Sequence, residues 1–301
     1  MAPGTVDTVD LSGDMTVPFR WDLVTPDQLG SLLDEATPPD LWFRDALVGC
    51  VGKVIARSGG GDLVFVGRSL DSMFDLLGGA FADLPDPPPL HRLPLSFART
   101  SWTDRGWVTR ALTAGDLAHA RGFLTALGVT PDLLARRARP VAFVDVVWQG
   151  STFTDLFDLV RTWVDDERGS WPVIRRKLRF VGVTRRTKTS PNTWRWQQHA
   201  PWTAQLPGAA VVNVSLDRDV WSYLANDQTK LTRTFRPEQW HAEADGPGHD
   251  ERTRAALAEA VALVAHGRSR AGRHTLARAI AGEPTLSEPW LRTLVHQLNL
   301  R

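Results

Sequence analysis

Cysteine and net charge are what this sequence most clearly lacks. Its 301 residues include one cysteine, Cys50, and 35 Lys and Arg residues against 34 Asp and Glu residues, for a net charge of +1. One cysteine excludes a disulfide framework and a cysteine-based zinc site. The eight histidines lack the His-x-x-x-His and Cys–His spacings of a dedicated zinc site. A charge near zero creates no field that would favour nucleic acid or a membrane as a partner.

Long apolar runs are also missing. No apolar run approaches the roughly 18 residues that indicate a membrane-spanning helix. The N-terminal stretch lacks the basic and then apolar pattern of a signal peptide. We therefore expect a cytoplasmic protein with no membrane or nucleic-acid partner. Its 43% hydrophobic and 23% charged residues are ordinary for a globular chain.

Short apolar runs alternate with amphipathic stretches, which predicts an α/β fold with a parallel sheet and helices on both faces. The predicted strands are Asp62–Val66, Leu93–Phe97, Val141–Val144, Leu178–Val183 and Ala209–Val214. The predicted helices are Pro26–Ala36, Asp40–Arg57, Leu70–Phe81, Ala114–Leu127, Pro131–Arg137, a helix from Thr152, Trp194–His199, Asp219–Ala225, Glu251–His266, Ala271–Ala281 and Ser287–Leu298. We expect an exposed loop over 98–111 and irregular chain over 226–248.

This order predicts three parts: an N-terminal extension or hood over residues 1–39, an α/β core over 40–225, and a helical C-terminal cap over 226–301.

The stretch Pro140–Thr152, P-V-A-F-V-D-V-V-W-Q-G-S-T, carries the clearest site signal. An apolar strand leads to one acid, Asp145, then to a short polar loop and to an amphipathic helix that begins at Thr152. Backbone N–H groups at such a helix start point outward, and the helix dipole adds partial positive charge. Gly150 allows close backbone approach, and the Ser151 and Thr152 hydroxyls are further donors. The pattern predicts an anion site.

These residues resemble the PRPP-binding motif of type I phosphoribosyltransferases, where PRPP is 5-phosphoribosyl 1-diphosphate. The motif has apolar residues, a pair of acids, an apolar pair, two variable positions, Gly, one further residue and Thr. Asp145, Gly150 and Thr152 match it. Val144 replaces the first acid, and Gln149 replaces the usual Thr. The resemblance implies that residues 149–152 hold the 5′-phosphate and that Asp145 contacts ribose hydroxyls or a metal-bound water.

A second strand–turn–helix pattern lies at Asp62–Asp75. In type I phosphoribosyltransferases the first core strand ends in a loop that binds pyrophosphate largely through backbone amides. Gly67, Arg68 and Ser69 resemble that loop, and Arg68 would add charge for a diphosphate. A plain structural alternative makes Arg68 a solvated side chain and Ser69 a helix N-cap.

The order of the segments agrees with that family. A mobile loop would fall at about 98–111, with Arg105 able to approach pyrophosphate, and a late acceptor-side loop at about 184–190, with Arg185 and Lys188. A solvated loop explains these basic residues equally well. Trp194, Trp196, Trp202 and Trp221 provide flat surfaces for an acceptor ring or simply fill the core.

The resemblance implies a fold of the type I phosphoribosyltransferase kind and transfer of 5-phosphoribosyl from PRPP to an unidentified acceptor, with Mg²⁺ as cofactor and Asp145 as its indirect ligand. Two alternatives stay open. The missing first acid suits a non-catalytic module that senses PRPP or a nucleotide. The sequence Gly67–Asp71 also approaches a Gly-x-Ser-x-Gly elbow, which would make Ser69 the nucleophile of a serine hydrolase with Asp145 and either His199 or His241. The oligomeric state, a homodimer included, is left open.

Overall fold

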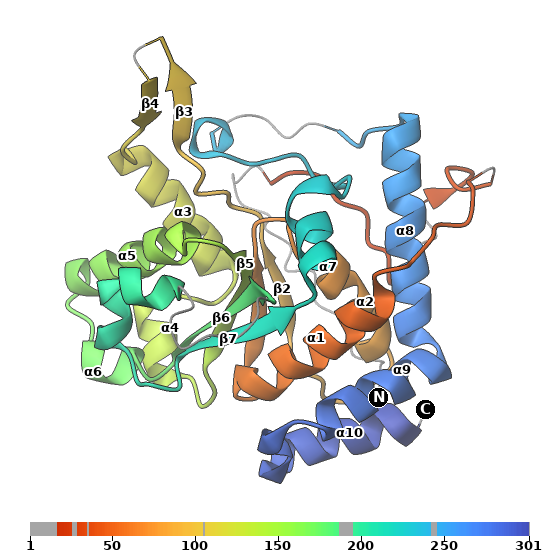
Figure 1. Cartoon of the computed structure of the whole chain (residues 1–301). Helices are drawn as coiled ribbons and strands as arrows, with labels where there is room; N and C mark the ends of the chain where they lie inside the picture. The colour runs from red at the N-terminus through yellow and green to blue at the C-terminus, as the bar shows by residue number, and fades with distance from the viewer. Residues whose placement is uncertain are drawn as a thin grey trace.

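The computed structural model describes residues 17–25, 29–34, 36–104, 106–186, 195–241 and 246–300. Its centre is a five-stranded sheet in the order β2-β1-β5-β6-β7, in which every neighbouring pair is parallel. The strands are β1 (Asp62–Val66), β2 (Leu90–Leu93), β5 (Val141–Val147), β6 (Leu178–Arg185) and β7 (Val211–Leu216). Helices cover both faces (Figure 1). The prediction of a parallel α/β sheet is confirmed.

Alternate residues of each strand point to opposite faces, so two apolar cores form. In β5, Ala142 and Val144 lie in one core, and Val141, Phe143 and Val147 lie in the other. The helices on the first side are α1 (Arg44–Ser58), α2 (Asp71–Phe81), α7 (Arg218–Ser222), α8 (Glu251–Arg268), α9 (Arg270–Ala281) and α10 (Pro289–Leu300). Those on the second side are α3 (Ala114–Ala126), α4 (Pro131–Arg136), α5 (Ser151–Asp166) and α6 (Trp171–Ile174).

Short helical turns complete the described chain. They are η2 (Trp196–His199), η3 (Pro201–Gln205), the π-helical turn η4 (Tyr223–Asp227), η5 (Pro237–Gln239) and η6 (Pro284–Ser287). None of the helices that the structure describes combines the length and the apolar character needed to cross a membrane.

The strand order fixes where a ligand site is expected. From β1 the chain moves outward to β2, and then returns to the other side of β1 to form β5. The direction of winding therefore reverses between β1 and β5. In doubly wound sheets, ligands bind at the carboxyl ends of the strands beside such a reversal. The loops after β1 and β5 meet at this place.

Three sequence predictions are wrong in detail. The second strand is Leu90–Leu93 instead of Leu93–Phe97, because Pro94 has no N–H group with which to continue a ladder. The expected loop over 98–111 contains an antiparallel hairpin, β3 (Thr100–Thr103) and β4 (Gly106–Thr109), which projects from the body in Figure 1. Within the predicted helix Pro26–Ala36, residues 29–34 form turns, and the positive φ of Gly30 interrupts a helical path.

The C-terminal segment returns to the sheet before it forms helices. Phe235 is buried among core residues of the second side, and it forms an isolated parallel bridge with Leu95. Farther along, α8 lies against α2, where a Cβ atom on Gly267 would be 2.1 Å from the carbonyl oxygen of Leu76. Trp21 and Leu23 pack with residues of α8 in a smaller third core.

Candidate functional site

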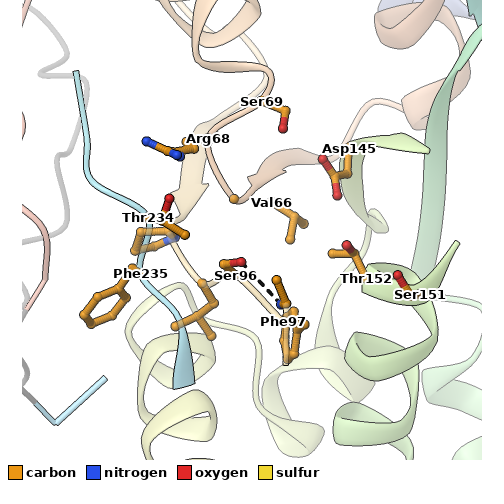
Figure 2. A pocket seen from close by; sticks show the side chains of 14 residues that line it. Val66, Arg68, Ser69, Ser96, Phe97, Asp145, Ser151, Thr152, Thr234 and Phe235 are labelled. Atoms are coloured by element: carbon orange, nitrogen blue, oxygen red, sulfur yellow. Dashed lines mark hydrogen bonds between the residues drawn. The ribbon is translucent and has the colours of Figure 1, made fainter. Parts of the chain in front are cut away.

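A pocket of about 270 Å³ lies where the carboxyl ends of β1 and β5 meet (Figure 2). The loop after β1 contributes Gly67, Arg68 and Ser69, and the end of β5 with the start of α5 contributes Asp145, Ser151 and Thr152. The remaining wall comes from Val66, from residues 94–98, and from Thr234 and Phe235. Two stretches that the sequence marked separately, about 80 positions apart, therefore line one pocket.

Among the described residues that line the pocket, Asp145 has the only carboxylate. It is 6% exposed, and Figure 2 shows its side chain pointing toward the same space as Ser69. Its Oδ1 accepts the backbone N–H of Val146 at 2.7 Å, and the Thr152 side chain also hydrogen-bonds to it. Burial raises the pKa of Asp145 to about 8, although both hydrogen bonds act in the opposite direction. A carboxyl group that is costly to ionise thus faces the pocket.

The valine in place of the first motif acid does not lie in the pocket. Val144 is fully buried in the core of the opposite face, because neighbouring residues of β5 alternate between faces. The side chain available to a ligand at this strand end is Asp145.

Helix α5 begins at the pocket. Its first N–H groups have no partner within the helix, and the 16-residue helix has no acidic side chain in its first turn. Ser151 and Thr152 line the pocket at this end. Gln149 is exposed and lies outside the lining residues, and so does Gly150, which is buried with φ at +82°. The predicted four-residue phosphate loop is therefore represented in the pocket by its second half.

Two cationic side chains, Arg68 and Lys230, tie the loop after β1 to residues 230–232. Arg68 lines the pocket and donates from Nη1 to the carbonyl oxygen of Thr232 at 2.9 Å. Lys230 donates from Nζ to the carbonyl oxygen of Ser69 at 3.1 Å. Burial lowers the pKa of Arg68 and that of Lys230 to about 8. The sequence marked Arg68 but not Lys230, because residues 226–248 have no periodicity that predicts contact with this loop.

Asp71, which follows this loop, is a structural residue. It accepts Arg92 Nε at 3.0 Å and Arg20 Nη1 at 3.0 Å in a buried cluster, and Arg20 also pairs with Asp75. Arg92 further donates to the hydroxyl of Thr232 at 2.9 Å. The two arginines counter the cost of burial and hold the pKa of Asp71 below its ordinary value. The cluster fixes the start of α2 to β2 and to the N-terminal segment.

Of the other predicted basic residues, Arg185 can be placed and does not line this pocket. Arg185 is the last residue of β6 and is not among the lining residues. Arg105 and Lys188 lie outside the described residues. Two further arginines of the 98–111 segment are ion-paired: Arg99 with Asp155 and Arg110 with Asp116 at 2.9 Å.

The geometry gives no support to a serine hydrolase. Within the part of the chain that the structure describes, no histidine lines the pocket with Ser69 and Asp145. His241 instead lies 3.4 Å from Asp116, and His199 lies in η2. At the position where the elbow motif has its last glycine, the buried Asp71 is engaged with Arg20 and Arg92.

Of the four tryptophans that the sequence offered as acceptor surfaces, three lie in the described part of the chain. Trp196, Trp202 and Trp221 are buried, so the described ones fill the core. Trp194 lies outside the described residues. Trp148, in the loop after β5, is 58% exposed, with its ring centroid 6.1 Å from that of Trp221.

Comparison with known proteins adds no family assignment. A scan of family models, a search of curated proteins and a search of solved structures each return no match to this chain. The function therefore has to be argued from the pocket.

Proposed function

We propose that this pocket binds PRPP and that the chain transfers the 5-phosphoribosyl group to an acceptor, with release of diphosphate. One observation carries the proposal: both strand–loop–helix segments that resemble the family's phosphate loops line a single pocket, with Asp145 between them. Its volume of about 270 Å³ is just below the range of roughly 300–1,000 Å³ that is usual for ligand pockets. That size suits a sugar phosphate better than a large ligand.

Each part of the ligand has a matching group. The start of α5 offers unpaired N–H groups and the Ser151 and Thr152 hydroxyls to a 5′-phosphate. The N–H of Gly67 donates to the carbonyl oxygen of Leu93 at 2.8 Å, so this loop offers the diphosphate the backbone amides of Arg68 and Ser69, the Arg68 cation and the Ser69 hydroxyl. Asp145 faces the space between them and accepts hydrogen bonds from ribose hydroxyls when it is ionised.

The donor set fits magnesium only together with a phosphorylated ligand. The described residues contain no group of three or more His, Cys, Asp or Glu side chains able to hold a metal by themselves. Mg²⁺ is commonly held by one or two carboxylates plus substrate phosphates, and Asp145 supplies one carboxylate. When bound, the ion supplies positive charge to the departing diphosphate. Its charge also favours the ionised form of Asp145.

The reaction asks for positioning more than for covalent chemistry. The bond from C1 to the diphosphate oxygen breaks, and its electron pair leaves with that oxygen. The acceptor's nucleophilic atom then forms the new bond to C1. The transition state resembles an oxocarbenium ion, so holding both phosphates fixed and offering negative charge from Asp145 near the ribose lowers the barrier.

The direct test is PRPP binding measured by calorimetry in the presence of Mg²⁺. We expect binding to the native chain and none to Asp145→Ala, with the fold of the variant checked by circular dichroism. Equal binding by both proteins would remove Asp145 from the site.

A non-catalytic PRPP-binding module is the second candidate. It is favoured by the single carboxylate among the lining residues that the structure describes and by the burial of Val144 away from the pocket. Diphosphate release separates the two candidates. PRPP incubated with the protein and a cell metabolite extract should release diphosphate if the chain is a transferase, whereas binding without release from any extract favours the module.

A further inference from the structure

The cations around the loop after β1 are of two kinds. Arg20 and Arg92 are neutralised by Asp71 and Asp75, at distances that include 3.0 Å for Arg20 to Asp71. Lys230 and Arg68 have no such partner: within the described part of the chain, neither has a carboxylate oxygen within 4.0 Å. They are held by neutral oxygen atoms instead, namely the Ser69 and Thr232 carbonyls and the side chain of Gln228.

These two cations tie the loop to one neighbouring segment, residues 228–235. Lys230 holds the carbonyl of Ser69, and Arg68 holds the carbonyl of Thr232. The same segment continues to Phe235, whose carbonyl accepts the N–H of Ser96 at 2.8 Å in the opposite wall of the pocket. The position of the loop therefore depends on a segment that lies more than 150 positions away in the chain.

Asp71 acts on Lys230 and Arg68, and Glu259 acts on Lys230, only from beyond ion-pair distance, so the positive charge of these two buried or half-buried side chains is incompletely countered in the folded chain. Lys230 is not among the residues that line the pocket, so an anion bound beside Gly67, Arg68 and Ser69 would not touch it. The Lys230 ammonium group donates a hydrogen bond to the Ser69 carbonyl. Lys230 therefore acts on a bound anion through the loop and not by direct contact with the anion. A dianionic or trianionic group gains more from this charge than a neutral sugar does.

We propose that Lys230 is a positioning residue of the diphosphate half of the pocket: it fixes the loop Gly67–Ser69 and supplies the positive charge behind it. The inference rests on the proposed PRPP function and assigns the C-terminal segment a part in it. It requires Lys230 to act on the diphosphate end and to have little effect on the 5′-phosphate end at α5.

The experiment compares inorganic pyrophosphate with ribose 5-phosphate as calorimetric ligands, both with Mg²⁺. For Lys230→Met we expect about tenfold weaker pyrophosphate binding and ribose 5-phosphate binding within about twofold of the native value, since a lost charge-assisted contact changes affinity on this scale. Lys230→Arg keeps the charge and should recover most of the pyrophosphate affinity. A purely structural role for Lys230 would instead weaken both ligands together.

The possible failures are distinguishable. If the native chain binds neither ligand, the proposed function fails. If the native chain binds both, and Lys230→Met binds pyrophosphate as tightly as the native chain, the role of Lys230 is refuted while the proposed function stands. If Lys230→Met does not fold, Lys230→Gln provides the same comparison with a polar side chain of similar length.

Discussion

Gly150 lies directly against the indole ring of Trp196. A Cβ atom on Gly150 would be 2.3 Å from Cε3 of that ring, and the indole Nε1 of Trp196 donates to Asn213 Oδ1 on β7 at 2.8 Å. The loop before α5 therefore packs against the buried Trp196, and the indole of Trp196 is hydrogen-bonded to the edge strand β7. The need for glycine here follows from this packing and from the φ of +82°, without any ligand.

The first prediction concerns stability. Gly150→Ala combines an unfavourable positive φ with a steric clash, so we expect the free energy of unfolding to fall by about 2 kcal/mol or more. Gly208→Ala is the matched control, because a Cβ there meets nothing within 4 Å and no positive φ is required. Urea denaturation measures both. Equal stability of the two variants would mean that Trp196 does not seat this loop.

The second prediction concerns the buried ion pairs of Asp71. Asp71→Ala leaves Arg20 and Arg92 without this partner in a buried place, and we expect a loss of about 3–5 kcal/mol in the free energy of unfolding. The exposed pair of Asp132 with Arg136, at 2.8 Å, is the control: Asp132→Ala should change stability by less than about 1 kcal/mol. A small effect at Asp71 would contradict the structural role assigned to this cluster.

The third prediction follows from the pKa of Asp145, which burial raises from 3.8 to about 8 in the ligand-free protein. Between these values the folded chain keeps a proton that the unfolded chain has released. The free energy of unfolding therefore falls as pH rises through this window, by up to about 1.4 kcal/mol per pH unit.

Asp145→Asn removes this dependence. Denaturation of both proteins at a series of pH values from about 5 to about 8 should show the native chain losing stability relative to the variant. Parallel curves would show that Asp145 is not held protonated by its surroundings.

Local patterns in the sequence predicted much of the fold. The strand Asp62–Val66 and the helix start near Asp71 agree with the structure, because an apolar run bounded by Gly61 and Gly67 leaves little choice of boundaries. The hairpin over 100–109 was missed, since its strands are short, polar and unpaired with the main sheet.

Part of the lining of the candidate pocket was also marked in the sequence, for the same reason. Asp145, Ser151, Thr152 and the Gly67–Ser69 loop were found because strand–loop–helix order is visible locally. The wall formed by Thr234 and Phe235, and the contact of Lys230 with Ser69, depend on the path of a segment without periodicity. Only tertiary structure brings that segment to the pocket. The role of Gly150 also needed the position of Trp196, which no local pattern specifies.

The central claim is that one pocket holds both ends of a phosphoribosyl diphosphate, and a crystal structure of the protein with PRPP and Mg²⁺ tests it most directly. We predict the 5′-phosphate within hydrogen-bond distance of the amides and hydroxyls of Ser151 and Thr152, and the diphosphate at the loop Gly67–Ser69. We also predict ribose hydroxyls facing Asp145. PRPP bound elsewhere, or an empty pocket at a saturating concentration of PRPP, would contradict the account.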